Sequence, residues 1–151
     1  MTEIEPARSR TQRKADVLAK LERDVDLWVA SADETGGAYL VPLSYHWDGS
    51  TLTIATPSAS PTARNLIRAR WVRAALGQTR DVVIVEGRVE AIPIGADPEL
   101  EDAHARSTGF DPRTLADEYV YLRIAPQEVQ AWRESNELEG RVLMRDGTWL
   151  E

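Results

Sequence analysis

The chain has 151 residues, the size of one domain, and a formal net charge of −7. It contains no cysteine, which excludes disulfides, thiolate nucleophiles and thiolate metal ligands. Its two histidines, at positions 46 and 104, have no carboxylate at metal-ligand spacing, so we expect no metal site. No apolar run is long enough for a membrane helix, and the N-terminus lacks the apolar segment of a secretory signal. We therefore expect a cytoplasmic protein that does not bind membranes.

The N-terminal half of the sequence predicts a tail, a helix and three strands. Residues 1–7 are expected to be disordered, and the apolar spacing that follows predicts an amphipathic helix from Arg8 to Asp24. Alternating, β-rich stretches predict strands at residues 26–32, 38–47 and 51–56. Pro42 lacks an N–H donor, which indicates that its strand lies at an edge, is bulged there, or faces a ligand.

The C-terminal half predicts further short strands with few helices. Strands are expected at residues 72–76, 81–92, 118–124, 141–145 and 148–150. Gly87 indicates a bulge in the second of these, and helices are expected to begin at Pro98 and Pro112. There is no alternating β-α-β series. The pattern therefore predicts a mainly β (α+β) fold, an antiparallel barrel of about six to eight strands with peripheral helices, formed by residues 8–151 as one domain.

A possible anion site follows the third strand. Ser60 and Pro61 are typical of a helix N-terminus, with serine as the N-cap and proline in the first turn. Free N–H groups and the helix dipole favour negative charge at such a position. From Gly49 to Arg80 there are five arginines and no acid, a basic island in an acidic chain. This indicates a local anionic ligand rather than nucleic acid, which would require a broad positive surface. Each of these arginines could equally belong to a solvated helix face.

The aromatic residues suggest a second part of a ligand site. Trp28 and Trp71 lie in apolar runs and are expected to belong to the core. Trp132 lies in polar surroundings, with Arg133 and Arg141 near it, an arrangement that suits a flat anionic ring system. No phosphate-binding Gly-Lys-Ser/Thr loop and no Gly-x-Ser-x-Gly turn occurs, so a cofactor is the more plausible source of chemistry.

From roughly Val25 to Leu150 the chain resembles the pyridoxamine 5′-phosphate oxidase-like family of flavin-binding split β-barrels. The likeness rests on three ordered stretches, DLWVASADETGGAYLVPLSYHWDGSTLTIATPSASPTARNL, DVVIVEGRVEAI and AWRESNELEGRVLMRDGTWL. The resemblance implies a split barrel and a homodimer that binds flavin between its subunits. FMN is the cofactor that the family would usually hold.

The resemblance also implies residue roles. The isoalloxazine ring would lie along Val41, Pro42, Leu43 and Ser44. The ring and ribityl chain would be flanked by Ile54, Ala55 and Thr56. The phosphate would be received by Ser58, Ser60, Thr62 and Arg64. The partner subunit would contribute its own copies of Trp132 and Arg141.

The phosphate loop departs from the family pattern. Ser60-Pro61-Thr62 stands where relatives commonly carry Ser-Arg-Lys, so two charge-assisted hydrogen bonds are missing. The first hypothesis is an FMN-dependent oxidoreductase that passes electrons or a hydride to a small organic substrate. Tyr45 and Arg141 are candidate proton donors, although the catalytic residues stay unknown. The alternatives are a reductase that uses the deazaflavin coenzyme F420, and a non-catalytic flavin-binding or cofactor-free barrel.

Overall fold

The computed structural model describes residues 3–151. Residues 1 and 2, the start of the predicted disordered tail, lie outside the described residues. Residues 3–7 form neither helix nor strand, and Asn136 Nδ2 donates a hydrogen bond of 2.9 Å to the Glu5 carbonyl. The helices are α1 (Arg10–Arg23), α2 (Pro61–Ala69) and α3 (Pro98–Thr108), with short 3-10 turns at Pro112–Thr114 and Ser135–Glu137.

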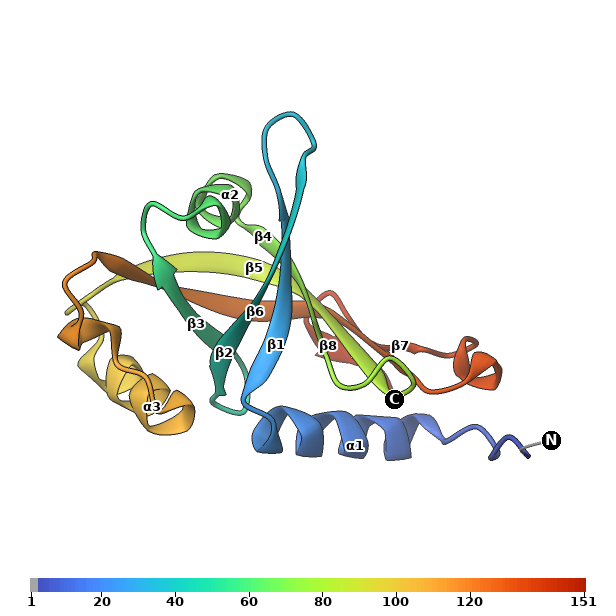
Figure 1. Cartoon of the computed structure of the whole chain (residues 1–151). Coiled ribbons are helices and arrows are strands. Elements are labelled where there is room, and N and C mark those ends of the chain that lie inside the picture. Colours follow the sequence, from blue (N-terminus) through green and yellow to red (C-terminus); the bar gives the residue numbers. More distant parts are fainter. Residues whose placement is uncertain (1–2) are drawn as a thin grey trace.

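The strands close into a barrel, as Figure 1 shows. They are β1 (Asp26–Ala32), β2 (Ala38–Trp47), β3 (Leu52–Pro57), β4 (Trp71–Leu76), β5 (Val82–Pro93), β6 (Tyr119–Trp132), β7 (Val142–Arg145) and β8 (Thr148–Trp149). The order β3-β2-β1-β4-β5-β6 is closed by pairing of β3 with β6, and the pairings are antiparallel. β7 and β8 extend the sheet beyond β6. This confirms the predicted antiparallel barrel with peripheral helices.

Alternation along the strands builds the core. Leu27 and Val29 of β1 are buried on the same face as Ile54 and Ile124 of the closing strands. Burying each such side chain contributes about 1.5–3 kcal/mol before the entropy of folding is subtracted. α1 lies across one end of the barrel (Figure 1) and inserts Val17 among these residues.

Tyr45 belongs to this core, which corrects its candidacy as a proton donor. Its side chain is 1% exposed and its hydroxyl donates a hydrogen bond of 2.9 Å to the Leu21 carbonyl of α1. Burial raises its pKa further above the ordinary tyrosine value. The hydroxyl therefore anchors α1 to the barrel and does not reach a ligand.

β6 is the main difference from the predicted elements. The sequence predicts a strand that ends at Ile124, but β6 continues to Trp132 through Pro126. Glu86 pairs with Glu128 and Gly87 pairs with Pro126, so the register shifts by one residue between Glu86 and Gly87. Proline is tolerated in a strand at such a bulge. The bulge expected at Gly87 is confirmed, and it explains how the strand accommodates Pro126.

Candidate functional site

The start of α2 has the predicted form. Ser60 is the N-cap in extended conformation, and its Oγ accepts a hydrogen bond of 3.1 Å from the Ala63 N–H. Pro61 occupies the first turn, where its missing N–H costs nothing. Ser60 Oγ also lies 3.0 Å from Thr56 Oγ1 at the end of β3. The hydrogen bond between these two hydroxyls links the end of β3 to the start of α2.

The other predicted hydroxyls differ in exposure. Thr56 and Thr62 are only 4% and 2% exposed, whereas Ser58 is half-buried at the surface of the loop. The Ser58 N–H donates a hydrogen bond of 2.9 Å to the Glu118 carbonyl, which holds the loop against the segment before β6. Ser58 is thus the loop hydroxyl that is best placed to meet a ligand, and the two threonines support it from inside.

A hollow of about 480 Å³ lies between the exposed face of α2 and the β1–β2 turn. Arg64 and Arg68 both line it. Arg68 Nη2 donates to the Ala32 carbonyl at 2.5 Å, which fixes this arginine to the end of β1. Arg64 is exposed and has no hydrogen-bond or ion-pair partner of its side chain among residues 3–151. Its guanidinium is available to an anion.

The carboxylate of Asp33, which lines this hollow, already has hydrogen-bond partners. It accepts hydrogen bonds from the Thr35 hydroxyl and from the Thr35 and Gly37 N–H groups at 2.7–2.9 Å. These bonds lower the pKa of Asp33 below its ordinary value. The carboxylate therefore shapes the turn and leaves Arg64 unpaired.

β2 and β3 separate next to this helix. They pair only from Tyr45 with Ile54 to Trp47 with Leu52. Earlier in β2, Val41 to Ser44 pair with β1 on one side, while Ala55 and its successors in β3 pair with β6. The four β2 residues of the predicted site therefore face a gap in the barrel wall, which accounts for Pro42 being tolerated there. Ile54 points into the core and is 0% exposed, so it supports the site from behind.

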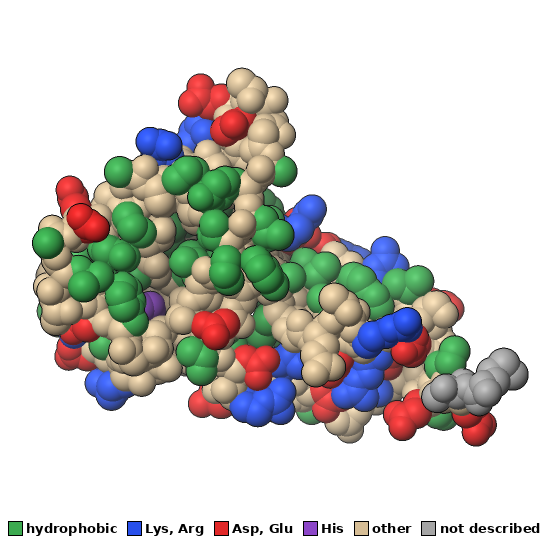
Figure 2. Space-filling model, in the orientation of Figure 1, with side chains coloured by type: hydrophobic (Ala, Val, Ile, Leu, Met, Phe, Trp, Pro, Cys, Tyr) green, Lys and Arg blue, Asp and Glu red, His purple; other side chains and the backbone are tan. Residues whose placement is uncertain are grey.

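The outer face of the sheet carries the remaining candidates. One row of paired residues crosses five strands of this face: Pro42, Trp28, Ala75, Ile84 and Gln130. Trp132 lies two residues beyond Gln130 on the same side of β6. Arg141 donates from Nε to Gln130 Oε1 at 3.1 Å. Figure 2 shows hydrophobic side chains gathered over the region of β1, β2 and α2.

Trp28 and Trp71 correct the expectation that both are core residues, because they are 49% and 42% exposed. The alternation of β1 could have indicated this, since Leu27 and Val29 are buried and the residue between them must point outward. Trp28 pairs with Pro42, so it adds apolar surface beside the proposed ring site. Trp71 adds apolar surface further along β4 on the same side of the sheet.

The two groups of site residues do not meet within one chain. From Pro42 to Gln130 the row spans four strand spacings, roughly 19 Å. Trp132 is the last residue of β6, whereas Thr56 pairs with Val120 near the start of β6. The structure brings together the β2, β3 and α2 candidates, and it places Trp132 with Arg141 elsewhere on the same face.

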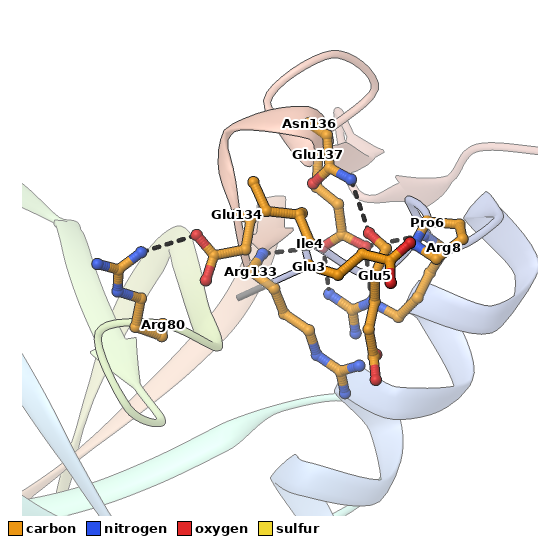
Figure 3. Close-up of a pocket in the computed structure, with 10 residues that line it drawn as sticks. All are labelled: Glu3, Ile4, Glu5, Pro6, Arg8, Arg80, Arg133, Glu134, Asn136 and Glu137. Atoms are coloured by element: carbon orange, nitrogen blue, oxygen red, sulfur yellow. Dashed lines mark hydrogen bonds and ion pairs between the residues drawn. The ribbon is translucent and has the colours of Figure 1, made fainter. Parts of the chain in front are cut away.

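A hollow of about 650 Å³ lies elsewhere, between the N-terminal segment and the turn after β6 (Figure 3). Two ion pairs line it: Arg8 binds Glu137 at 2.7 Å and Arg80 binds Glu134 at 2.7 Å. A ligand there would have to displace these pairs. We therefore regard this hollow as part of the structure that joins the chain ends.

Two negative findings concern the described part of the chain alone. In residues 3–151 no three side chains of the metal-ligating types are grouped closely enough to hold an ion. Over the same residues no helix has the length and apolarity needed to cross a bilayer.

Solved structures with the same fold are numerous. A conserved hypothetical protein of Mycobacterium tuberculosis, Rv2991, is 18% identical with a TM-score of 0.68, covering 90% of this chain and 91% of its own. A protein described as an F420 reductase is 18% identical with a TM-score of 0.61, covering 74% and 93%. An FMN-binding, pyridoxamine 5′-phosphate oxidase-related protein of Nostoc punctiforme is 14% identical with a TM-score of 0.51, covering 81% and 78%. At these identities the likeness establishes the fold alone.

No curated protein matches the chain significantly. The family model described as pyridoxamine 5′-phosphate oxidase matches residues 14–133, which include most of the barrel and end next to Trp132. This match covers well over half of the sequence, and the closed antiparallel barrel agrees with it. The chain therefore belongs to the pyridoxamine 5′-phosphate oxidase family.

Proposed function

We propose that the protein is an FMN-binding oxidoreductase that works as a homodimer. The observation that carries the proposal is the division of the site residues between two parts of one exposed apolar face. Pro42 and Arg64 lie at the open side of β2 and α2, whereas Trp132 and Arg141 lie at the end of β6. In a two-fold dimer each copy applies the same face to the other, so the second group of one copy can complete the first group of its neighbour.

The donor set fits an anionic flavin. Arg64 provides an unpaired guanidinium in the first turn of a helix, and Ser58 provides a half-buried hydroxyl in the loop before that helix. The main chain of Val41–Ser44 faces a gap instead of a neighbouring strand, so it can bind the polar edge of a ring. Ile54, Thr56, Ser60 and Thr62 hold this loop in place. When bound, FMN would supply hydride or electron transfer to a small organic substrate.

The protein groups would bind, orient and shield the cofactor. Trp132 of the second copy would cover the ring, and Arg141 would place positive charge beside it. We assign no strong base, because Tyr45 is buried and His46 is engaged with Ser107 of α3. The role of these protein groups in the proposed reaction is therefore to bind and orient the cofactor, with no side chain assigned to remove a proton.

A deazaflavin is the second candidate cofactor, for a specific structural reason. Arg64 and Arg68 face a hollow of about 480 Å³ that continues away from the loop, which would accommodate a longer anionic tail than that of FMN. One of the structural neighbours is described as an F420 reductase. Both cofactors would use the same phosphate donors, and titrating the protein with each of them separately compares the two affinities.

Arg64→Ala tests the proposed site. Removing the guanidinium should weaken FMN binding by about 1.5–3 kcal/mol, or roughly 10- to 100-fold, because a charge-assisted hydrogen bond is lost. The measurement is quenching of flavin fluorescence on titration of purified protein, repeated with coenzyme F420. Arg106→Ala, an exposed arginine of α3, is the matched control and should leave the affinity unchanged.

The results of these titrations distinguish an oxidoreductase from a flavin carrier and from a cofactor-free barrel. Absorbance at about 450 nm identifies bound FMN and absorbance at about 420 nm identifies the deazaflavin. If neither cofactor binds the wild-type protein, the proposal is wrong and the barrel is cofactor-free. If a cofactor binds but its reduced form is not reoxidised by any small acceptor, the protein is a carrier rather than an oxidoreductase.

A further inference from the structure

Two glutamates face each other on the outer side of the sheet. Glu86 of β5 and Glu128 of β6 are directly paired next to the bulge. Side chains in this position on an antiparallel pair have Cβ atoms about 4.5–5.5 Å apart, and two like charges there repel. The Glu86 side chain is only 14% exposed, so water screens the repulsion poorly. A proton held between the two carboxyl groups removes it.

The pair belongs to a chain of hydrogen bonds that ends at Arg141. Arg73 Nη2 donates to Glu86 Oε1 at 2.7 Å, on one side of the pair. On the other side, Gln130 Nε2 donates to Glu128 Oε2 at 3.1 Å. The same Gln130 accepts the Arg141 Nε–H at 3.1 Å through Oε1. Because one amide group makes both bonds, the position of Glu128 orients Gln130. Gln130 then holds the Arg141 guanidinium together with the Leu138 carbonyl, which accepts a hydrogen bond of 2.9 Å from Arg141 Nη1.

The charges around the pair divide it into an ionised and a protonated member. Burial raises the pKa of Glu86, but the Arg73 hydrogen bonds outweigh this and lower it overall. The hydrogen bond with Glu86 raises the pKa of Glu128 and burial adds to this, whereas the hydrogen bond from Gln130 and the charge of Arg145 of β7 lower it. Arg88 and Glu90 of β5 are further charged side chains on this face of the strand. The proton therefore resides mainly on Glu128.

We propose that Gln130 and the Glu86–Glu128 carboxyl pair position Arg141 for the cofactor of the neighbouring copy, and that they do so only while the two carboxyl groups share one proton. The proposal rests on the proposed function, in which Arg141 meets the flavin. Gln130 is a positioning residue, since it acts through Arg141. When the shared proton leaves, the two carboxylates repel and Glu128 moves away from Glu86. Gln130, whose hydrogen bond favours the ionised form of Glu128, follows it and releases Arg141.

The test measures the FMN dissociation constant by fluorescence quenching between about pH 5 and about pH 9, above the ordinary glutamate pKa. Wild-type affinity should fall as the pH rises through the titration of the pair. Glu128→Gln keeps an oxygen for Gln130 and gains a permanent donor to Glu86, so it should retain the affinity and lose the pH dependence. Gln130→Ala should bind about three- to tenfold more weakly at low pH and show little pH dependence.

A cofactor-free readout separates this proposal from the proposed function. The Arg141 Nε–H proton should exchange slowly in the NMR spectrum of wild-type protein at low pH and quickly in Gln130→Ala, with Arg141→Gln identifying the signal. Gln127→Ala on the same strand is the control and should leave both readouts unchanged. Equal affinity and exchange in wild type and Gln130→Ala, or an unaltered pH profile in Glu128→Gln, would overturn the inference. Slow exchange with no FMN binding would overturn the proposed function alone.

Discussion

At the scale of single residues, the side chains of His104 and Tyr121 are an unusual feature of the interior. Both are 0–1% exposed, and their rings meet edge to face with centroids 5.4 Å apart. Neither the His104 ring nitrogens nor the Tyr121 hydroxyl has a hydrogen-bond partner within residues 3–151. A buried polar group without a partner costs about 1–3 kcal/mol. The surroundings of the His104 side chain, on the buried face of α3, therefore favour a neutral imidazole.

This burial predicts a pH-dependent stability. Burial lowers the pKa of His104 to about 4, with His46 adding to the effect and Asp111 opposing it. The unfolded chain takes up the proton at about pH 6.5, so stability falls as the pH drops from there towards about 4, by about 3 kcal/mol. His104→Phe should abolish this slope in urea unfolding followed by tryptophan fluorescence. His46→Gln, which removes the other histidine, should keep it; the reverse result would contradict the assignment.

At the scale of elements, β5 and β6 show what local sequence signals can predict. The Val82–Pro93 strand is β-rich throughout, so its span and its bulge at Gly87 were predictable. β6 was predicted only to Ile124, because Pro126 and the polar residues after it resemble a loop. What keeps them in the sheet is pairing with β5, a non-local effect that no local pattern contains. The start of α2, by contrast, follows from Ser60 and Pro61 alone.

The bulge leaves no room for a side chain at Gly87. A Cβ atom added there would lie 2.5 Å from the Ala125 carbonyl oxygen, a backbone atom that cannot move independently of β6. Gly87→Ala should therefore destabilise the fold by about 1–3 kcal/mol, measured as a lower urea midpoint with an unchanged slope. Ala91→Ser, on the exposed part of the same strand, should stay within about 0.5 kcal/mol of wild type. Equal stability of Gly87→Ala and wild type would mean that the strands separate more easily at the bulge.

At the scale of the whole molecule, the barrel was predictable from the sequence, whereas the placement of the candidate site residues across its strands was not. The strands, the helix start and the gap at Pro42 follow from residues close in sequence. That Gln130 lies in the same row as Pro42 depends on the register of five strands. Trp28 and Trp71 were assigned to the core because they lie in apolar runs, although the alternation of their strands places them on the outer face once the buried neighbours are known.

The carboxylate of Glu137 links the N-terminal segment to the turn after β6. Glu137, after β6, is 2% exposed and accepts hydrogen bonds from the Arg8 backbone and guanidinium at 2.7–2.9 Å and from the Arg133 N–H at 2.8 Å. Figure 3 shows Arg8 and Glu137 directed at each other between α1 and the turn. The Arg8 hydrogen bonds lower the pKa of Glu137 to about 2, against the opposing effect of burial. The pair therefore stabilises the fold above the ordinary glutamate pKa.

Glu137→Gln should lower the free energy of unfolding at neutral pH by about 3–5 kcal/mol, because buried Arg8 loses its closest counter-charge and keeps only the half-exposed Asp16. In wild type the same contribution should disappear as the pH falls from about 4.5 towards about 2. Urea unfolding at both ends of that range measures it. Glu134→Gln removes an equal charge whose partner, Arg80, is 77% exposed, and it should cost less than about 1 kcal/mol. Equal losses for the two variants would show that Glu137 contributes only surface charge and that α1 docks through its apolar face.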